Sequence, residues 1–313
     1  MRKSGLILVL SMILFIAHSR AETGEGIIHG KFEDLTRSPV PVTITKIIDG
    51  TTMLGKDGTI YELPNLYIPD TQTDLAGTAQ KRLEKLTVDQ KCSAYLTRKP
   101  DMGRTNRMGH SLVELECGDD DIWIGGQLIA EGLAIVWPSA ANPEMTSGLL
   151  KLEDQARKTK KGLWTEGSTK VHTPETVKQH INARQIVEGT VYNTALVKNT
   201  IYLNFEQDWK TDFTIVVPSG LRRTFAKENI ALQSLKGKSV RVRGWVRAYN
   251  GPVIELENIG QLEILDSLPK TELDQPEYPT EPVAGMHTIK SPTPPSIKKP
   301  EAPKVNEVKN DND

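Results

Sequence analysis

The pattern of apolar and polar positions divides the chain into a leader, two β-rich stretches and a tail. The first residues carry a continuous apolar run, "GLILVLSMILFIA", behind Arg2 and Lys3. Short alternating runs, which are typical of strands, fill much of residues 42–166 and of residues 184–265. The pattern therefore predicts two β-rich domains between an apolar leader and a polar tail.

In the first domain, strand patterns alternate with helical spacing. "VTITKIIDGTTML" and "TIYEL" predict a strand–turn–strand unit, because Asp-Gly dipeptides mark turns. "DLAGTAQKRLEKLTV" and the start of "DIWIGGQLIAEGLAIVW" have the spacing of helices. A charged amphipathic helix in "SGLLKLEDQARKTKKGLW" is expected to stop at Gly162. The domain is thus predicted to be mainly β with about three helices.

The second domain is β throughout. Strands are predicted in "QIVEGTVYNTA", "NTIYLNFEQD", "DFTIVVP", "KSVRVRGWVRAYNGPVIELEN" and "QLEIL", at the spacing of a small barrel. "KENIALQSLKG" is expected to interrupt them as one helix or turn. "YNGP" predicts a hairpin turn, because Asn and Gly tolerate positive φ. Residues 167–183 are polar and predict a linker that could hold a short helix.

The leader predicts export. Its apolar run is short for a bilayer span, and "SRA" places small residues before a cleavage point ahead of Glu22. We expect residues 1–21 to be a signal peptide and the mature protein to be periplasmic or extracellular, with no stable membrane span after cleavage. An uncleaved membrane anchor is the alternative.

The two ends of the mature chain are expected to lack a fold of their own. Residues 22–41 show no strong periodicity and predict an irregular lead. Residues 266–313 are rich in Pro, Lys and Glu and poor in apolar residues. Such a composition cannot bury enough surface to offset the entropy of ordering, so a disordered tail is predicted.

Export to an oxidising compartment would favour a disulfide between the two cysteines. Cys92 and Cys117 lie in two strand-like runs on either side of a turn region. As an antiparallel pair these runs would bring the two thiols together, and an even count in an oxidising compartment favours a bridge. A Cys92–Cys117 disulfide is therefore predicted, with two buried thiols as the alternative.

Charge limits the ways in which the protein can bind a polyanion. The 313 residues carry a formal net charge of −1, so any nucleic-acid site must be a local patch. Two stretches cluster basic side chains, and the second, "VRVRGWVRAYNG", interleaves them with aromatics, which suits single-stranded nucleic acid through phosphate attraction and base stacking. The candidate contacts are Arg104, Arg107, Arg241, Arg243, Arg247, Trp245 and Tyr249. The alternative is a half-exposed strand with valines inward and arginines in water, and with Trp245 in the core or at the barrel rim.

Several segments together resemble the staphylococcal-nuclease-like (thermonuclease) family. They are "KIIDGTTML", "ELPNLYIPD", "NRMGHSLVEL", "GQLIAEGLAIVW" and "LLKLEDQARKTKKGLW", and they span residues 42–166. Residues 184–265 resemble an OB-type module that follows this domain in secreted members, through "TIYLNFEQDWKTDFTIVV" and "GKSVRVRGWVRAYNG". The resemblance implies two OB-type β-barrels, the first a nuclease-like barrel carrying helices.

The residues at the family's catalytic positions do not match its chemistry. The resemblance puts Glu62 and His110 where two phosphate-binding arginines belong, and Thr51 and Tyr67 where two metal-binding aspartates belong. Asp70 takes the position of the general-base glutamate. A glutamate in place of an arginine reverses the charge that must face a phosphate, and the lost aspartates no longer offset the dehydration of a cation.

We therefore expect a catalytically degenerate, exported pseudoenzyme that binds single-stranded nucleic acid or an envelope protein partner. Asp70, His110 and Glu62 would be inactive family positions, and neither a metal nor another cofactor is expected. The alternative is an active, divalent-metal-dependent secreted nuclease with rearranged residues. In that case Asp49, Thr51 and Asp70 would hold calcium or another divalent cation.

Overall fold

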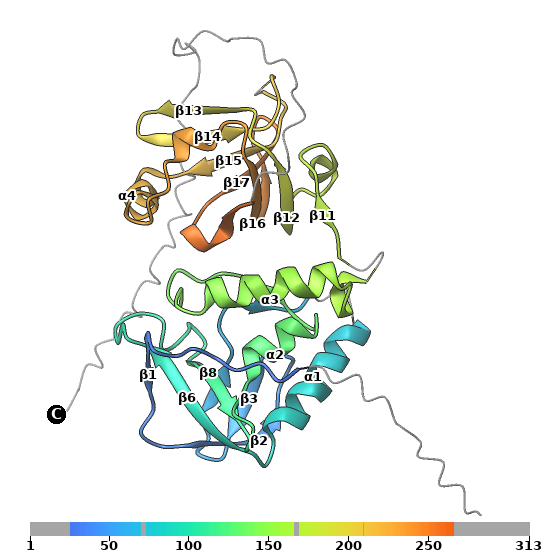
Figure 1. Ribbon diagram of the computed structural model, residues 1–313, viewed down its shortest axis with the longest axis vertical. Coiled ribbons are helices and arrows are strands. Elements are labelled where there is room, and N and C mark those ends of the chain that lie inside the picture. The colour runs from blue at the N-terminus through green and yellow to red at the C-terminus, as the bar shows by residue number, and fades with distance from the viewer. Residues whose placement is uncertain (1–25, 70–72, 166–168, 209, 266–313) are drawn as a thin grey trace, which may run out of the picture. The chain divides into compact units, whose positions relative to one another are not determined.

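The computed structural model describes residues 26–69, 73–165, 169–208 and 210–265. They form two compact units: unit 1 runs to Val171 and includes Glu257–Gln261, and unit 2 comprises His172–Leu256 and the chain from Leu262. The described residues are mainly β with four α-helices, which confirms the predicted fold class (Figure 1). The predicted signal peptide, the tail and Asp70 lie outside the described residues.

Unit 1 is built on one large sheet. Its strands are β1 (Leu35–Arg37), β2 (Val42–Ile47), β3 (Thr52–Gly55), β4 (Ile60–Glu62), β6 (Lys91–Thr97), β7 (Ser111–Leu112), β8 (Glu114–Cys117) and β9 (Ile122–Trp123). They pair in the order β7-β4-β3-β2-β6-β8-β9, and β1 pairs with β6. A separate antiparallel pair joins β5 (Leu66–Tyr67) to β10 (Ile135–Val136). Alternating side chains of β2, such as Val42 and Ile44, enter the core.

Three helices complete unit 1: α1 (Thr73–Thr87), α2 (Ile124–Ala130) and α3 (Thr146–Lys158). The helical spacing of the first is confirmed, since Ala79 and Leu83 are fully buried. The expected end of the last helix at Gly162 is wrong. The helix ends at Lys158, Lys160 then takes a positive φ of 53°, and a 3₁₀ turn follows over Gly162–Trp164.

Two glycines are required where this end of the domain packs closely. Gly132 and Gly162 both have positive φ, and a Cβ on either would meet a backbone carbonyl of the other segment at 2.2–2.3 Å. The amide of Leu163 donates to the carbonyl of Gly132 at 2.7 Å. The segments "EGLA" and "KKGLW" therefore touch backbone to backbone, which only glycine permits at these positions.

The segment before β2 is more regular than predicted. Leu35–Arg37 is a strand that pairs with β6, so the expectation of an irregular lead is wrong there. Upstream, Phe32 stacks on Tyr95 with ring centroids 4.1 Å apart. The backbone of Ile28 accepts from the amide of Trp123, and its own amide donates to Gln127. Long-range contacts thus order a segment that has no periodicity of its own.

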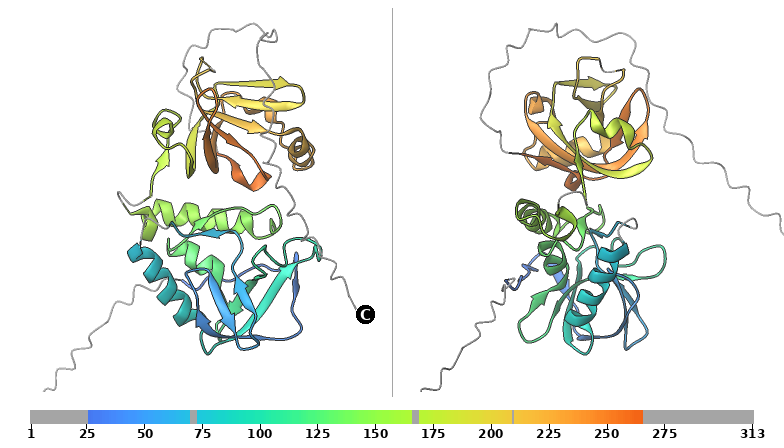
Figure 2. Two further views of the ribbon diagram at one scale, coloured as in Figure 1. Left: turned by 180° about the vertical axis from the view of Figure 1, so that it is seen from behind. Right: turned by 90° about the vertical axis from the view of Figure 1, so that its right-hand side faces the viewer.

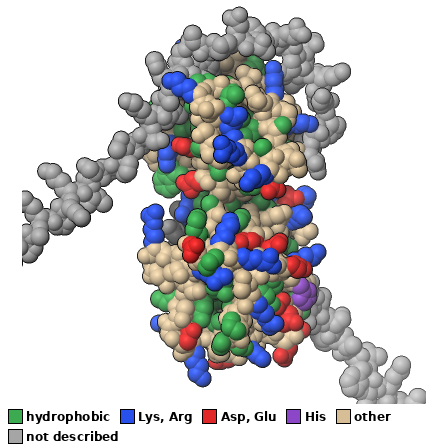
Figure 3. Space-filling model, turned by 90° about the vertical axis from the view of Figure 1, so that its left-hand side faces the viewer, with side chains coloured by type: hydrophobic (Ala, Val, Ile, Leu, Met, Phe, Trp, Pro, Cys, Tyr) green, Lys and Arg blue, Asp and Glu red, His purple; other side chains and the backbone are tan. Residues whose placement is uncertain are grey.

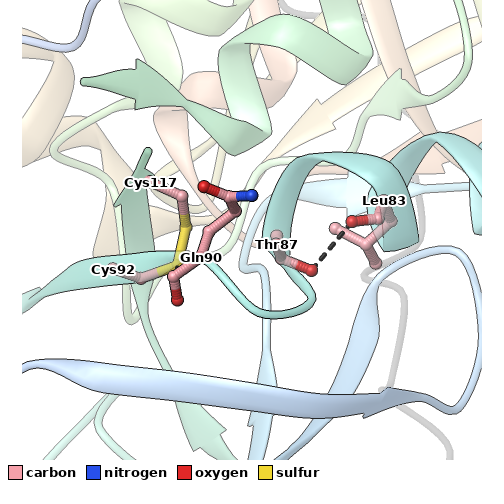
Figure 4. Close-up of a disulfide and its surroundings, with 5 residues drawn as sticks. All are labelled: Leu83, Thr87, Gln90, Cys92 and Cys117. Carbon is pink, nitrogen blue, oxygen red and sulfur yellow. Dashed lines mark hydrogen bonds between the residues drawn. A yellow bond between two sulfur atoms is a disulfide. The ribbon is translucent and has the colours of Figure 1, made fainter. Parts of the chain in front are cut away.

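The predicted disulfide is confirmed. Cys92 on β6 and Cys117 on β8 are direct register partners and form a bridge (Figure 4). Both side chains belong to the apolar core of unit 1. The bridge lies just after the end of α1, where the hydroxyl of Thr87 donates to the carbonyl of Leu83 at 2.8 Å.

Unit 2 is a second β-rich unit. Its strands are β11 (Val171–His172), β12 (Ala183–Thr190), β13 (Asn193–Val197), β14 (Thr200–Asn204), β15 (Thr214–Val217), β16 (Ser239–Ala248), β17 (Pro252–Glu255) and β18 (Leu262–Ile264). They pair in the order β11-β12-β16-β17-β15-β14-β13, with β18 on β16. In Figure 2 these strands curve around a common interior, which is compatible with the predicted OB-type barrel.

Three local features of unit 2 bear on the predictions. The helix α4 (Ser219–Lys227) lies in a segment for which no helix was predicted, and the expected helix or turn near Leu232–Leu235 is a 3₁₀ turn. The predicted hairpin turn is present, with positive φ at Asn250 and Gly251. The predicted linker contains β11 and a 3₁₀ turn at Thr176–Gln179, and unit 2 begins within it at His172.

No helix in the described ranges is both long and apolar enough to cross a bilayer.

A carboxylic acid is buried in unit 1. Glu114 on β8 is 3% exposed, and the indole Nε1 of Trp123 donates to its Oε2 at 2.7 Å. Burial raises the pKa of Glu114 from 4.5 to about 7, which outweighs the opposing effect of the Trp123 hydrogen bond. The group is therefore protonated in the folded protein under mildly acidic conditions.

The disulfide should contribute a large share of the stability of unit 1. The double variant Cys92→Ala/Cys117→Ala should lose about 3 kcal/mol of unfolding free energy, because a cross-link restricts the unfolded chain. Urea unfolding of the oxidised protein should shift on adding dithiothreitol, whereas the double variant should not respond. Two reactive thiols in the unfolded, unreduced protein would contradict the bridge.

Glu114 should make stability depend on pH. Its raised pKa stabilises the fold fully below pH 4.5, and this contribution disappears as pH rises to about 7. The wild type should therefore lose about 3 kcal/mol relative to Glu114→Gln across that window. Urea unfolding at several pH values measures the difference. Glu116→Gln, on the same strand, is the control and should follow the wild type.

Candidate functional site

The two positions where the resemblance expects arginines hold an acid and a histidine that bind each other. Glu62 ends β4, which pairs with β3 on one side and with β7 on the other. The Nδ1 of His110, just before β7, lies 2.8 Å from Oε2 of Glu62. A carboxylate only accepts hydrogen bonds, so Nδ1 carries the proton and donates. The two side chains are 12% and 30% exposed, for His110 and Glu62 respectively.

Asn106 holds this pair in place. Its Nδ2 donates to the same Oε2 of Glu62 at 2.8 Å. Its Oδ1 accepts from the backbone amides of Met108 and His110 at 2.9 and 3.0 Å. The amide side chain therefore fixes the loop between β6 and β7 and, through it, the histidine. Sequence reasoning missed Asn106, although an Asn shortly before a Gly in a turn-like segment is a signal for such a role.

The turn after β2 uses its carboxylate for its own geometry. Oδ1 of Asp49 accepts from the amide of Thr51 at 2.8 Å and from the Thr51 hydroxyl at 3.1 Å. In the next turn, Asp57 accepts from the amide of Thr59 and the hydroxyl of Tyr61, and the Thr59 bond lowers the pKa of Asp57. Both acids thus stabilise turns, which is the ordinary role of Asp there.

The second expected aspartate position contributes no carboxylate. Tyr67 lies on β5 opposite Ile135, and its ring meets Trp137 edge to face at 5.8 Å. Asp70 lies outside the described residues. Within the described ranges, no group of three or more His, Cys, Asp or Glu side chains could hold a metal ion.

The basic loop of unit 1 is only partly available to a ligand. Arg104 is half-buried, and its Nε donates to the carbonyl of Thr97 at 3.0 Å. Arg107 is exposed, as are the neighbouring Met102 and Met108. On the part of unit 1 that is drawn in Figure 3, basic and acidic side chains are mixed.

In unit 2 the predicted arginines divide into two kinds. Arg241 and Arg243 on β16 are 7% and 0% exposed. Arg241 donates to Glu188 at 3.0 Å, and Arg243 donates to Glu263 at 2.6 Å. Register places Glu188 on β12 and Glu263 on β18 directly opposite Arg241. These guanidinium groups are engaged by carboxylates inside the unit and are not presented to a phosphate.

The rest of the same strand face is open. Trp245 and Tyr249 are 49% and 45% exposed, so the tryptophan is not a core residue. Arg247 lies between them in sequence, and its guanidinium is 3.9 Å from Glu255, with both side chains well exposed. Residues two apart on a strand share a face. Trp245 and Arg247 therefore share one face of β16, and Tyr249 follows the strand in the hairpin turn. We call these three exposed residues the exposed aromatic face of unit 2.

Comparison with known proteins adds one finding. Residues 62–166 match the family model described as staphylococcal nuclease homologue. The match begins at Glu62 and ends at the boundary that the sequence predicts for the first domain. No curated protein matches the chain. Unit 1 therefore carries a domain of the staphylococcal nuclease homologue family.

Proposed function

We propose that the protein is an exported, non-cleaving relative of the nucleases that binds single-stranded nucleic acid. The observation that carries the loss of cleavage is the contact of Glu62 with His110 and Asn106. The resemblance places an arginine at each end of the Glu62–His110 contact, and both would face the scissile phosphate. In this protein Glu62 would repel a phosphate, and His110 is hydrogen-bonded to Glu62.

The chemistry of phosphodiester hydrolysis supports this reading. Cleavage needs cationic donors at the phosphate and hard oxygen ligands for a divalent cation. Thr51 supplies only a hydroxyl, which donates to Asp49 at 3.1 Å. Tyr67 packs against Trp137 instead of offering a carboxylate. With four family positions replaced, neither the phosphate clamp nor the metal site can form in the family's manner.

An active nuclease with rearranged ligands is the competing function. It would need Asp49 and Asp70 to gather around a cation. Oδ1 of Asp49 already accepts from the amide and the hydroxyl of Thr51, which is the ordinary structural role of Asp in such a turn. This is why we favour binding over cleavage.

The exposed aromatic face of unit 2 is the proposed binding surface. Trp245 and Tyr249 offer rings for bases to stack on, and Arg247 offers a cation for phosphate. The carboxylates around Arg241 and Arg243 limit the positive charge of this strand, so stacking should supply more of the affinity than charge does. An envelope protein partner is the alternative ligand, since exposed Trp, Tyr and Arg also favour protein interfaces.

Export is the proposed setting of this function. The Cys92–Cys117 disulfide is compatible with an oxidising compartment outside the cytosol. The proposal places the mature protein in the periplasm or outside the cell.

The proposal predicts no metal-dependent cleavage. Purified protein, incubated with single- and double-stranded DNA and RNA in calcium, magnesium or EDTA, should leave every substrate intact on a gel. If cleavage occurs and is lost in Asp49→Ala and Asp70→Ala but kept in the turn control Asp57→Ala, then the rearranged active site is real.

Binding should depend on the aromatic face. Trp245→Ala should weaken binding of a labelled oligothymidine by about 5- to 150-fold, because one stacked base contributes about 1–3 kcal/mol. Arg247→Ala should reduce the salt dependence of binding by about one unit of slope. Fluorescence anisotropy over a salt series measures both effects.

The matched control is Arg223→Ala on α4, another exposed arginine of unit 2, which should bind like the wild type. Equal affinity for wild type and Trp245→Ala would reject this surface, and no binding at all would point to a protein partner.

A further inference from the structure

A small cavity with a partly polar lining lies in unit 1, and none of the three residues Glu62, Asn106 and His110 lines it. It has a volume of about 10 Å³, at the lower end of what one water molecule needs. Its polar lining comes from Thr97 at the end of β6, Glu114 at the start of β8, and Asn142 and Glu144 in the loop before α3. The other lining residues include the apolar Leu35, Pro64 and Met145.

Two polar atoms at this cavity are buried without a hydrogen-bond partner among the described residues. They are Oε1 of Glu114 and Nδ2 of Asn142. The two residues are 3% and 5% exposed, respectively. Oε2 of Glu114 accepts from Trp123, which holds the carboxyl group in place while Oε1 has no hydrogen-bond partner in the described ranges. Asn142 is fixed through its backbone carbonyl, which accepts from Asn65 at 2.7 Å. Buried polar atoms in folded proteins are almost always satisfied, by protein or by water.

We propose that this cavity is a binding site for one ordered water molecule that bridges Glu114 and Asn142. The water oxygen accepts from Nδ2 of Asn142, which can only donate. One water hydrogen is donated to Oε1 of Glu114 when the carboxyl group is ionised. When it is protonated, Oε1 donates to the water instead. One molecule thus satisfies both atoms in either protonation state.

The unpaired Nδ2 donor of Asn142 bears on whether the cavity holds a water molecule or a cation. Glu144 also lines the cavity, and its Oε1 accepts from the hydroxyl of Thr97 at 2.5 Å. Two neighbouring carboxyl groups could attract a metal ion, and a metal ion would serve Oε1 of Glu114. The orientation of the Asn142 amide, with Nδ2 left without an acceptor among the described residues, favours a water oxygen over a cation at this place. Burial of Glu114 raises its pKa to about 7, so no cation is needed to neutralise it in mild acid.

The water would link parts of unit 1 that are distant in sequence. β8 belongs to the large sheet, and Asn142 belongs to the loop that leads into α3. The backbone of Ser139 in the same loop already donates to Asn65 at 2.7 Å. The bridge would add a further polar contact between this loop and the sheet, beside the hydrogen bond from Thr97 of β6 to Glu144.

A crystal structure of the full chain at high resolution tests the proposal directly. One spherical peak within about 3.2 Å of both Oε1 of Glu114 and Nδ2 of Asn142 is expected. A cavity without density would overturn the proposal. Contacts of about 2.3–2.6 Å to oxygens alone would also overturn it, because these lengths indicate calcium.

Thermal unfolding gives a second and independent test. The midpoint of the wild type should be the same in EDTA and in sodium, potassium, calcium or magnesium chloride at matched ionic strength. If one cation raises the midpoint of the wild type and of the control Glu116→Gln, but not of Glu114→Gln, then the cavity is a cation site and the water proposal fails. This test does not involve nucleic acid, so its outcome is separate from that of the proposed function.

Discussion

A charged side chain inside a protein must meet an opposite charge or hydrogen-bond partners, and this requirement governs both units. In unit 1, Arg82 on α1 makes a two-pronged contact with Glu131 after α2, and His110 meets Glu62. In unit 2, Arg241 and Arg243 meet Glu188 and Glu263. The same rule decides function, since a side chain committed to an internal partner has little left to offer a ligand.

This principle separates the basic residues of the chain into structural and available groups. A pattern such as "VRVRGWV" suggests a basic track, but the two arginines nearest its start are neutralised within the sheet. What remains exposed is largely aromatic. Unit 1 resembles a nuclease domain, but the surface that we propose for ligand binding is the exposed aromatic face of unit 2.

Local patterns predicted much of the fold. The apolar spacing of α1, the Asn-Gly turn at Asn250 and the pairing of Cys92 with Cys117 all depend on short-range signals or on one adjacent strand pair. The strand at Leu35–Arg37 and the burial of Arg243 depend on partners far away in sequence. No local period reveals them. Helix α4 was missed because its main buried side chain is Phe225, which leaves little apolar periodicity to detect.

The candidate site was less predictable than the fold for the same reason. The replacements at Glu62 and His110 could be read from the resemblance, but their mutual contact and the role of Asn106 required the geometry of the loop after β6. The buried Glu114 gave only a weak signal, because an acid in an alternating strand normally faces water. Glu114 is surrounded by Trp123 and by the loop before α3, both of which lie outside its own strand.

The disulfide has a consequence for biogenesis. The chain has only 2 cysteines, so one intramolecular pairing exists and oxidation cannot trap a scrambled monomer. Cys92 and Cys117 are register partners on adjacent strands and are separated by 25 residues in sequence, so the bond joins two strands that already pair. In an oxidising environment the bond could form as soon as these strands meet, with no need for disulfide shuffling by an isomerase.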